Sequence, residues 1–143
     1  MMLAPHFTLR EFERTSTGLP NRSPKSCHAR LRRLCGHILE PLRGYLERPV
    51  IVTSGYRSSA VNRAVHGSPT SQHMRGEAAD IKVEGVAADV LAAAIVALGV
   101  PFDQVIWYDI ERGGHVHVSY SIRRARRQVL HAPATGGYTP WTP

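Results

Sequence analysis

Apolar and polar positions recur along the chain with two periods, one typical of helices and one of strands. A helical period spaces six apolar residues along one face of a segment whose other face is basic: Cys27, Leu31, Leu34, Cys35, Ile38 and Leu42 against Arg30, Arg32, Arg33 and Arg43. This pattern predicts an amphipathic helix. We expect Pro41 to kink it or split it in two, because proline lacks an amide hydrogen and clashes with the preceding turn.

Three further helices are predicted where helix formers follow a capping residue or end at a glycine. The expected helices are residues 9–14, 58–66 and 87–98. Thr8 and Glu11 form a Thr-x-x-Glu capping box before the first of them. The third is rich in alanine and ends at Gly99.

Strands are predicted where apolar and polar residues alternate or where β-branched residues cluster. The expected strands are residues 50–53, 80–84, 105–108 and 116–120. The last two should form a hairpin across the turn Arg112-Gly113-Gly114. Residues 15–22 read as a loop, and the proline- and glycine-rich tail 132–143 should be irregular, which leaves a single domain over residues 1–131.

Metal-ligating side chains lie on two of these strands. Asp80 should begin its strand on the face opposite Ile81, and His115 and His117 should share one face of theirs. A hydrolytic Zn²⁺ takes three ligands from imidazole and carboxylate groups and keeps a fourth position open. His73, Asp80 and one histidine of the His-x-His pair meet this requirement. We interpret the other histidines as surface or core residues: His6, His28, His37, His66 and His131.

The elements together predict an α+β fold. Its small antiparallel sheet should have helices packed on one face and the zinc site on the other. A chain of 143 residues with 43% hydrophobic residues is large enough to bury one core. Cys27 and Cys35, eight residues apart on the expected helix, are too distant for a disulfide and should be free thiols.

The formal net charge of +7 suggests contact with polyanions, and the segment Arg123–Arg127 concentrates basic residues. Anionic envelope polymers are one possible partner, and a solvated basic surface is the alternative. Nucleic acid is disfavoured because the segment contains no aromatic residue. The chain has no apolar stretch near 18 residues and no charged-then-apolar leader, so we expect no transmembrane segment and no signal peptide.

A family resemblance is carried by the metal-ligating segments. Ser-x-His-x-x-Gly-x-Ala-x-Asp at residues 71–80, followed by His-x-His at 115–117, resembles the signature of the zinc D-alanyl-D-alanine peptidases. That group includes LAS-type peptidoglycan peptidases and phage endolysins. Other segments fit as well: residues 7–12, 49–58, 61–62 and 103–106. The resemblance covers about residues 6–121 and is closest to short phage and prophage members.

The resemblance implies a Hedgehog/DD-peptidase-like fold with one Zn²⁺ per chain. It assigns His73, Asp80 and His117 as the zinc ligands and places His115 outside this ligand set, near the metal-bound water. Arg57 would stabilise the negative charge that develops on the scissile carbonyl oxygen. A structural ion pair is the alternative interpretation of Arg57.

The general base is left open by the sequence. Many family members have a glutamate a few residues before the last histidine, where this chain has Gly113 and Gly114. Asp109 or Glu111 could serve if the turn folds over the metal, and His115 could take the role itself.

The function implied is that of a zinc metallopeptidase of the D,D-carboxypeptidase or endopeptidase type, endolysin-like in its action on the cell wall. Its substrate would be a peptidoglycan stem or cross-bridge peptide, and we expect a monomer. The alternative is a non-catalytic zinc-binding module of the same fold that binds peptidoglycan or protein. We expect synthesis in the cytoplasm and action on the wall after release, or within a virion.

Overall fold

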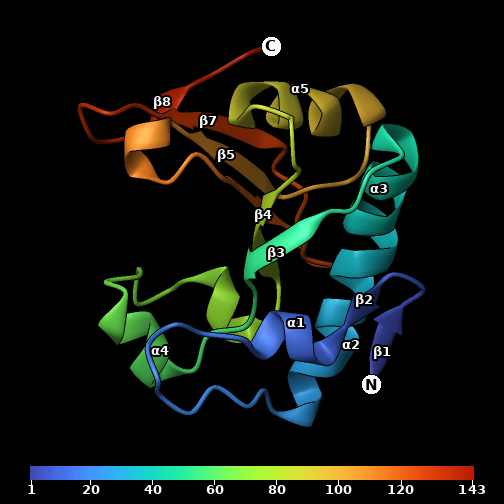
Figure 1. The fold of residues 1–143 in the computed structure, drawn as a ribbon, viewed down its shortest axis with the longest axis vertical. Coiled ribbons are helices and arrows are strands. Elements are labelled where there is room, and N and C mark those ends of the chain that lie inside the picture. Colours follow the sequence, from blue (N-terminus) through green and yellow to red (C-terminus); the bar gives the residue numbers. More distant parts are fainter.

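The computed structural model describes residues 1–143 and is built around a six-stranded sheet (Figure 1). The strands lie in the order β3 (Ile51–Ser54), β4 (Ala78–Lys82), β6 (Val116–Ser119), β5 (Gln104–Tyr108), β7 (Gln128–Ala132) and β8 (Thr139–Pro140). All neighbours pair antiparallel except β5 and β7, which are parallel. A separate pair, β1 (Met2–Ala4) and β2 (Phe7–Thr8), opens the chain.

The helices begin and end close to the predicted residues. They are α1 (Leu9–Glu13), α2 (Lys25–Leu34), α3 (Glu40–Leu46), α4 (Ser59–Ala64) and α5 (Ala88–Leu98). The capping box is confirmed, because the Thr8 side chain accepts from the Glu11 amide and the Glu11 carboxylate accepts from the Thr8 amide. Gly99 ends α5 with φ of +74°, a left-handed conformation that favours glycine.

The predicted amphipathic helix is confirmed, and Pro41 splits it without ending it. A π-helical turn, η1 (Cys35–Leu39), joins α2 to α3, and Pro41 lies in the first turn of α3. Because Pro41 has no amide hydrogen to bond into the preceding turn, the hydrogen bonding changes to the wider π pattern there. Figure 1 shows α2 and α3 as one long rod beside the sheet.

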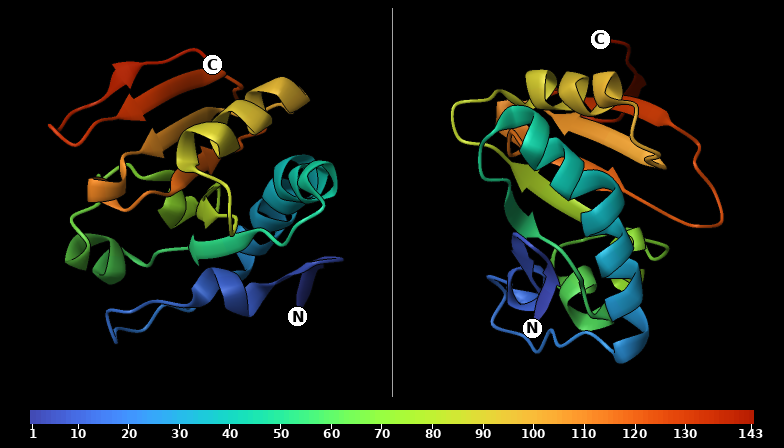
Figure 2. Two further views of the ribbon diagram at one scale, coloured as in Figure 1. Left: turned by 45° about the horizontal axis from the view of Figure 1, so that its top comes forward. Right: turned by 90° about the vertical axis from the view of Figure 1, so that its right-hand side faces the viewer.

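The two faces of the sheet differ in character. Alternate residues such as Ile81 on β4, Val116 on β6 and Val105 on β5 are fully buried in the hydrophobic core with α2, α3 and α5. Figure 2 shows α3 and α5 on the same side of the sheet. The intervening residues, including Asp80 and His117, therefore face the opposite side. The expected division into a helix-covered face and a polar face is confirmed.

Three details of the prediction were wrong. The sheet is mixed, not purely antiparallel, because β7 pairs parallel with β5. Asp80 is the third residue of β4, since Ala78 and Ala79 extend the strand despite their low strand propensity. The tail is not wholly irregular, because Thr139 and Pro140 pair with β7 as β8. A proline is tolerated there because β8 is the edge of the sheet.

Cys27 and Cys35 are free thiols, as predicted, and both are buried. Burial raises the pKa of the Cys35 thiol to about 12. None of the helices combines the length and the apolar character needed to cross a lipid bilayer.

Candidate metal centre

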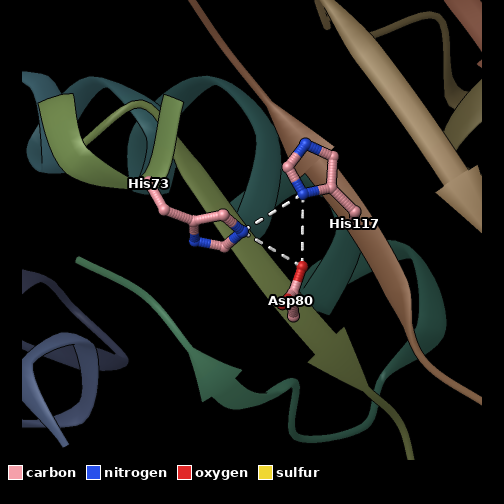
Figure 3. A group of neighbouring side chains, drawn as sticks. All are labelled: His73, Asp80 and His117. Carbon is pink, nitrogen blue, oxygen red and sulfur yellow. Dashed lines mark hydrogen bonds and ion pairs between the residues drawn. The ribbon is translucent and has the colours of Figure 1, made fainter. Parts of the chain in front are cut away.

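Three side chains with metal-ligating atoms converge on the polar face of the sheet (Figure 3). Asp80 on β4 and His117 on β6 are direct partners in the antiparallel register. His73 comes from the 3₁₀ turn η2 (Gln72–Arg75), which precedes β4. Gly76 ends η2 with φ of +75° and lets the chain turn into the strand.

The three nearest ligand atoms form an almost equilateral triangle. His73 Nε2 lies 3.2 Å from His117 Nδ1 and 3.3 Å from Asp80 Oδ1, and His117 Nδ1 lies 3.2 Å from Asp80 Oδ1. A tetrahedral Zn²⁺ with bonds of about 2.0–2.1 Å separates its ligand atoms by about 3.3–3.4 Å. The triangle therefore has the size that a zinc ion requires, and it leaves a fourth position open.

The orientation of His73 is fixed by a backbone carbonyl. His73 Nδ1 lies 2.7 Å from the oxygen of Gly55 and donates its proton there, so the neutral ring carries a lone pair on Nε2, toward the other two ligands. Gly55 cannot carry a side chain, because a Cβ atom would lie 2.6 Å from the Cα of Phe12. The close packing of Gly55 against Phe12 thus sets the position of the carbonyl that orients the histidine.

The pKa values of Asp80 and His117 are both shifted in the direction that favours metal binding. Burial by itself would raise the pKa of Asp80, but His73 and His117 outweigh it and hold that pKa well below its usual range. Burial lowers the pKa of His117, which favours the neutral ring. An ionised carboxylate and neutral imidazoles are the ligand forms that Zn²⁺ binds.

Arg57 contacts the carboxylate oxygen that the histidines leave free. Its Nη2 donates to Asp80 Oδ2 at 3.1 Å, and its Nε donates to Ser54 Oγ at 3.1 Å. Nη1 donates to Asn62 Oδ1 at 3.4 Å. Arg57 therefore forms the ion pair considered as its alternative role, and it also lines the cavity over the triad.

The structure separates the three candidates for the general base. His115 reaches the site, with Nε2 4.0 Å from Asp80 Oδ2 and its ring stacked on Tyr108. Asp109 turns away, because its carboxylate accepts from His131 at 2.6 Å and from the Ala134 amide at 2.8 Å. Glu111 is exposed on the turn η3 (Ile110–Arg112). Neither acid lines the cavity that holds the triad.

A sequence model of the family described as Peptidase M15 matches residues 5–119 of the chain. The chain belongs to the peptidase M15 family. This is a family of zinc D-alanyl-D-alanine peptidases, so the resemblance drawn from the sequence is confirmed and the chain is a metallopeptidase of the zinc type. No curated protein matches the chain.

The peptidase cavity has a volume of about 520 Å³ and includes residues that sequence reasoning missed. Tyr108 and Gln104 of β5 line it, together with Arg124, Arg126 and Tyr138 from the part of the chain beyond the family match. The two arginines were visible only as members of a basic segment. No sequence pattern pointed to Tyr138, which reaches the cavity because β8 folds back on β7.

A second buried carboxylate lies beside the metal site of this peptidase. Asp103 is fully buried and accepts from Arg126 Nε at 2.8 Å, from Arg126 Nη2 at 2.9 Å and from Gln72 Nε2 at 3.1 Å. Arg124 Nε lies 3.3 Å from the same carboxylate. Because Gln72 directly precedes His73, Asp103 ties the segment after β6 to the turn that carries a metal ligand.

Proposed function

We propose that this chain is a zinc peptidase that cleaves peptide bonds of bacterial peptidoglycan. The observation that carries the proposal is the triangle of His73 Nε2, Asp80 Oδ1 and His117 Nδ1, which has the dimensions of a three-ligand zinc site and opens into a cavity. Its setting supports the proposal, because the ligands come from two paired strands and an anchored turn and are held rigidly.

His73, Asp80 and His117 would hold one Zn²⁺ per chain. When bound there, zinc supplies a Lewis acid for the substrate carbonyl and lowers the pKa of a coordinated water toward 7. Asp80 would use Oδ1 for the metal while Oδ2 accepts from Arg57. All three ligands belong to one chain, which is consistent with activity as a monomer.

His115 is the residue that we assign as general base. It lies on the cavity wall, and stacking on Tyr108 fixes its ring at a centroid separation of 4.3 Å. Burial lowers its pKa, which keeps the imidazole neutral and able to accept a proton at neutral pH. His115 would take a proton from the attacking water and return it to the leaving amine.

Arg57 would donate to the scissile carbonyl oxygen as negative charge develops there. A guanidinium is charged at every relevant pH and carries several N–H groups, so Arg57 can hold Asp80 and also donate to a substrate in the cavity that it lines. Ser54 and Asn62 fix the plane of this guanidinium, so little reorganisation is needed during the reaction.

The proposed substrate is a peptidoglycan stem or cross-bridge peptide, cleaved as by a D,D-carboxypeptidase or endopeptidase with an endolysin-like role. Stem peptides carry free carboxylates, and the cavity is lined by Arg57, Arg124 and Arg126 with Asp80 as its one acidic residue. We also propose a Hedgehog/DD-peptidase-like fold. Since this substrate lies outside the cytoplasmic membrane, the protein would reach it after release from the cytoplasm or as part of a virion.

The test is a zymogram over bacterial cell walls, combined with metal analysis of the same protein. We expect clearing that a chelator abolishes and added Zn²⁺ restores. A protein that contains one zinc but clears no walls and releases no peptide would instead be a non-catalytic zinc-binding module. Analysis of the released ends by mass spectrometry identifies the bond that is cleaved.

A further inference from the structure

A second cavity, distinct from the peptidase site, is lined by arginines. It has a volume of about 490 Å³ and lies between α2, the segment that leads from η2 into β4, and the loop that follows β6. Five arginines line it, with Glu77 as the one acidic residue: Arg30, Arg33, Arg75, Arg123 and Arg124. The lining therefore carries a formal net charge of +4.

Three of these arginines have no carboxylate to balance them. Arg75 pairs with Glu77 at 2.8 Å, and Arg124 pairs with Asp103 at 3.3 Å. Arg30, Arg33 and Arg123 have no acidic group within 4.0 Å. Like charges gathered around a concave surface repel one another and focus a positive potential into it, and a bound anion relieves that repulsion.

We infer that this arginine cavity binds phosphate groups of an anionic cell-wall polymer, an inference whose choice of polymer rests on the function proposed above. A guanidinium presents paired N–H donors that match two oxygens of a phosphate, which makes arginine the usual residue for such contacts. The cavity shares Arg124 with the peptidase cavity, so the two sites are adjacent. A polymer attached to the wall and held here would keep the wall beside the metal site.

The lining favours a wall polymer over single-stranded nucleic acid or a membrane. Single-stranded nucleic acids bind through aromatic rings on which bases stack. Tyr120 is the one aromatic residue in the lining, and His37 already stacks on it at a centroid distance of 4.7 Å. Membrane binding at the interface strengthens with the apolar area that inserts, in addition to the attraction of basic residues to anionic lipids. Ile122 is the one aliphatic residue of the lining, which is otherwise polar or charged apart from Tyr120.

The test measures binding of fluorescent poly(glycerol phosphate) to the full zinc-loaded chain by anisotropy at fixed ionic strength. The double variant Arg33→Gln, Arg123→Gln removes two unpaired arginines from the cavity. The control Arg10→Gln, Arg22→Gln removes the same charge from two exposed arginines that line neither cavity. We expect the cavity variant to bind at least about 10-fold more weakly, since each lost bond to a charged group contributes about that factor, and the control to bind almost as wild type.

Equal weakening of both double variants would overturn the inference, because it would show a general attraction to a basic surface. Tighter binding of single-stranded DNA, or of phosphatidylglycerol vesicles, than of the polymer would overturn the assignment to a wall polymer. Thermal melting of each variant checks that it is folded. The wild-type measurement needs no hydrolysis, so a protein that binds the polymer but clears no walls would refute the peptidase proposal alone.

Discussion

Two buried aspartates lie close to the same sheet, and their neighbours differ. Asp80 faces two imidazole rings on one oxygen and Arg57 on the other. Asp103 faces two arginines, a glutamine amide and the backbone amide of Arg126. Both carboxyls have a pKa below the usual value, because their partners outweigh the effect of burial, which by itself would raise it.

The difference lies in the donors available to each carboxylate. All of the groups around Asp103 are N–H donors, so its lone pairs are satisfied without any further atom. Around Asp80 Oδ1, His73 offers a lone pair because its Nδ1 proton is committed to Gly55. His117 Nδ1 lies 3.2 Å from Asp80 Oδ1 and 3.2 Å from His73 Nε2, so the three atoms are close enough to share one cation or proton. Burial of a carboxylate alone does not distinguish a metal site from a structural ion pair, whereas its neighbours do.

The sharpest test of this contrast removes one member of the triangle. His117→Ala should lose nearly all zinc and, with it, hydrolysis, because two ligands cannot close the site. His131→Ala is the matched control, since His131 is bonded to Asp109 outside the triangle and should leave zinc at one per chain. The measurement is the zinc content of purified protein. A His117→Ala protein with a full zinc complement would place the metal elsewhere.

The second test concerns the base and has a somewhat smaller expected effect. His115→Ala should lower kcat by about 10²–10⁴-fold and remove the acidic limb of the pH–rate profile, with zinc content near one. Asp109→Asn and Glu111→Gln should keep most of the activity, because neither acid lines the cavity. Near-normal rates in all three variants would mean that another group moves the proton.

The third test asks whether Arg57 belongs to the reaction or to the ion pair. Arg57→Ala should retain zinc and lower kcat by about 10²-fold, as removal of one donor to a developing oxyanion does. If Arg57 serves only to hold Asp80, the main effect would instead be a 10- to 100-fold loss of zinc affinity. Measuring kcat, KM and zinc affinity on the same protein separates the two roles, and Arg57→Lys shows how much depends on charge alone.

The sequence predicted correctly those elements whose local residue pattern matches the structure that they adopt in the fold. The capping box at Thr8, the amphipathic helix and the strand that carries His117 each follow from spacing within a few residues. Alternation along β4 and β6 likewise predicted that Asp80 and His117 share one face. His73 lies outside both strands, and the choice of His117 over His115 came from the family resemblance. The parallel strand β7 was missed, since its pairing with β5 joins residues 24 positions apart, as Gln104 with Gln128, and its mixed polar sequence lacks a clear alternation.

The surroundings of the site depended on contacts that no local pattern encodes. Nothing in the sequence shows that Asp109 turns toward His131, because that contact requires β7 to lie beside β5. The arginine segment is visible in the sequence as a concentration of charge. Only the folded chain shows that Arg124 and Arg126 pair with Asp103 while Arg123 and Arg124 line the arginine cavity. The contacts of Asp109 and of the arginine segment therefore depend on long-range strand pairing, which residue type alone does not predict.

The fourth test concerns Asp103 and has the smallest expected effect, a loss of stability. Asp103→Asn should keep one zinc per chain but lower the free energy of unfolding by about 1–3 kcal/mol at pH 7, because it replaces charge-assisted bonds to Arg126 and Arg124 by weaker ones. Glu84→Gln is the control, as Glu84 is exposed and its carboxylate has no partner. The measurement is urea unfolding of the three proteins. Loss of zinc from Asp103→Asn would show that the two carboxylates are not separate in function.

The difference in the free energy of unfolding between wild type and Asp103→Asn should depend on pH in a definite direction. The pKa of Asp103 is lowered in the folded protein, because the hydrogen bonds and charges of Arg126 and Arg124 outweigh the opposing effect of burial. An unfolded aspartate has a pKa of about 3.9, so the stabilisation by the ionised carboxylate is complete above that pH and is lost as the pH falls through the lower folded value. The gap between wild type and Asp103→Asn should therefore be constant from pH 7 to about pH 5 and shrink below pH 4. If the difference in the free energy of unfolding instead grew on acidification, Asp103 would be held in its protonated form. The comparison of two ionised aspartates would then be wrong.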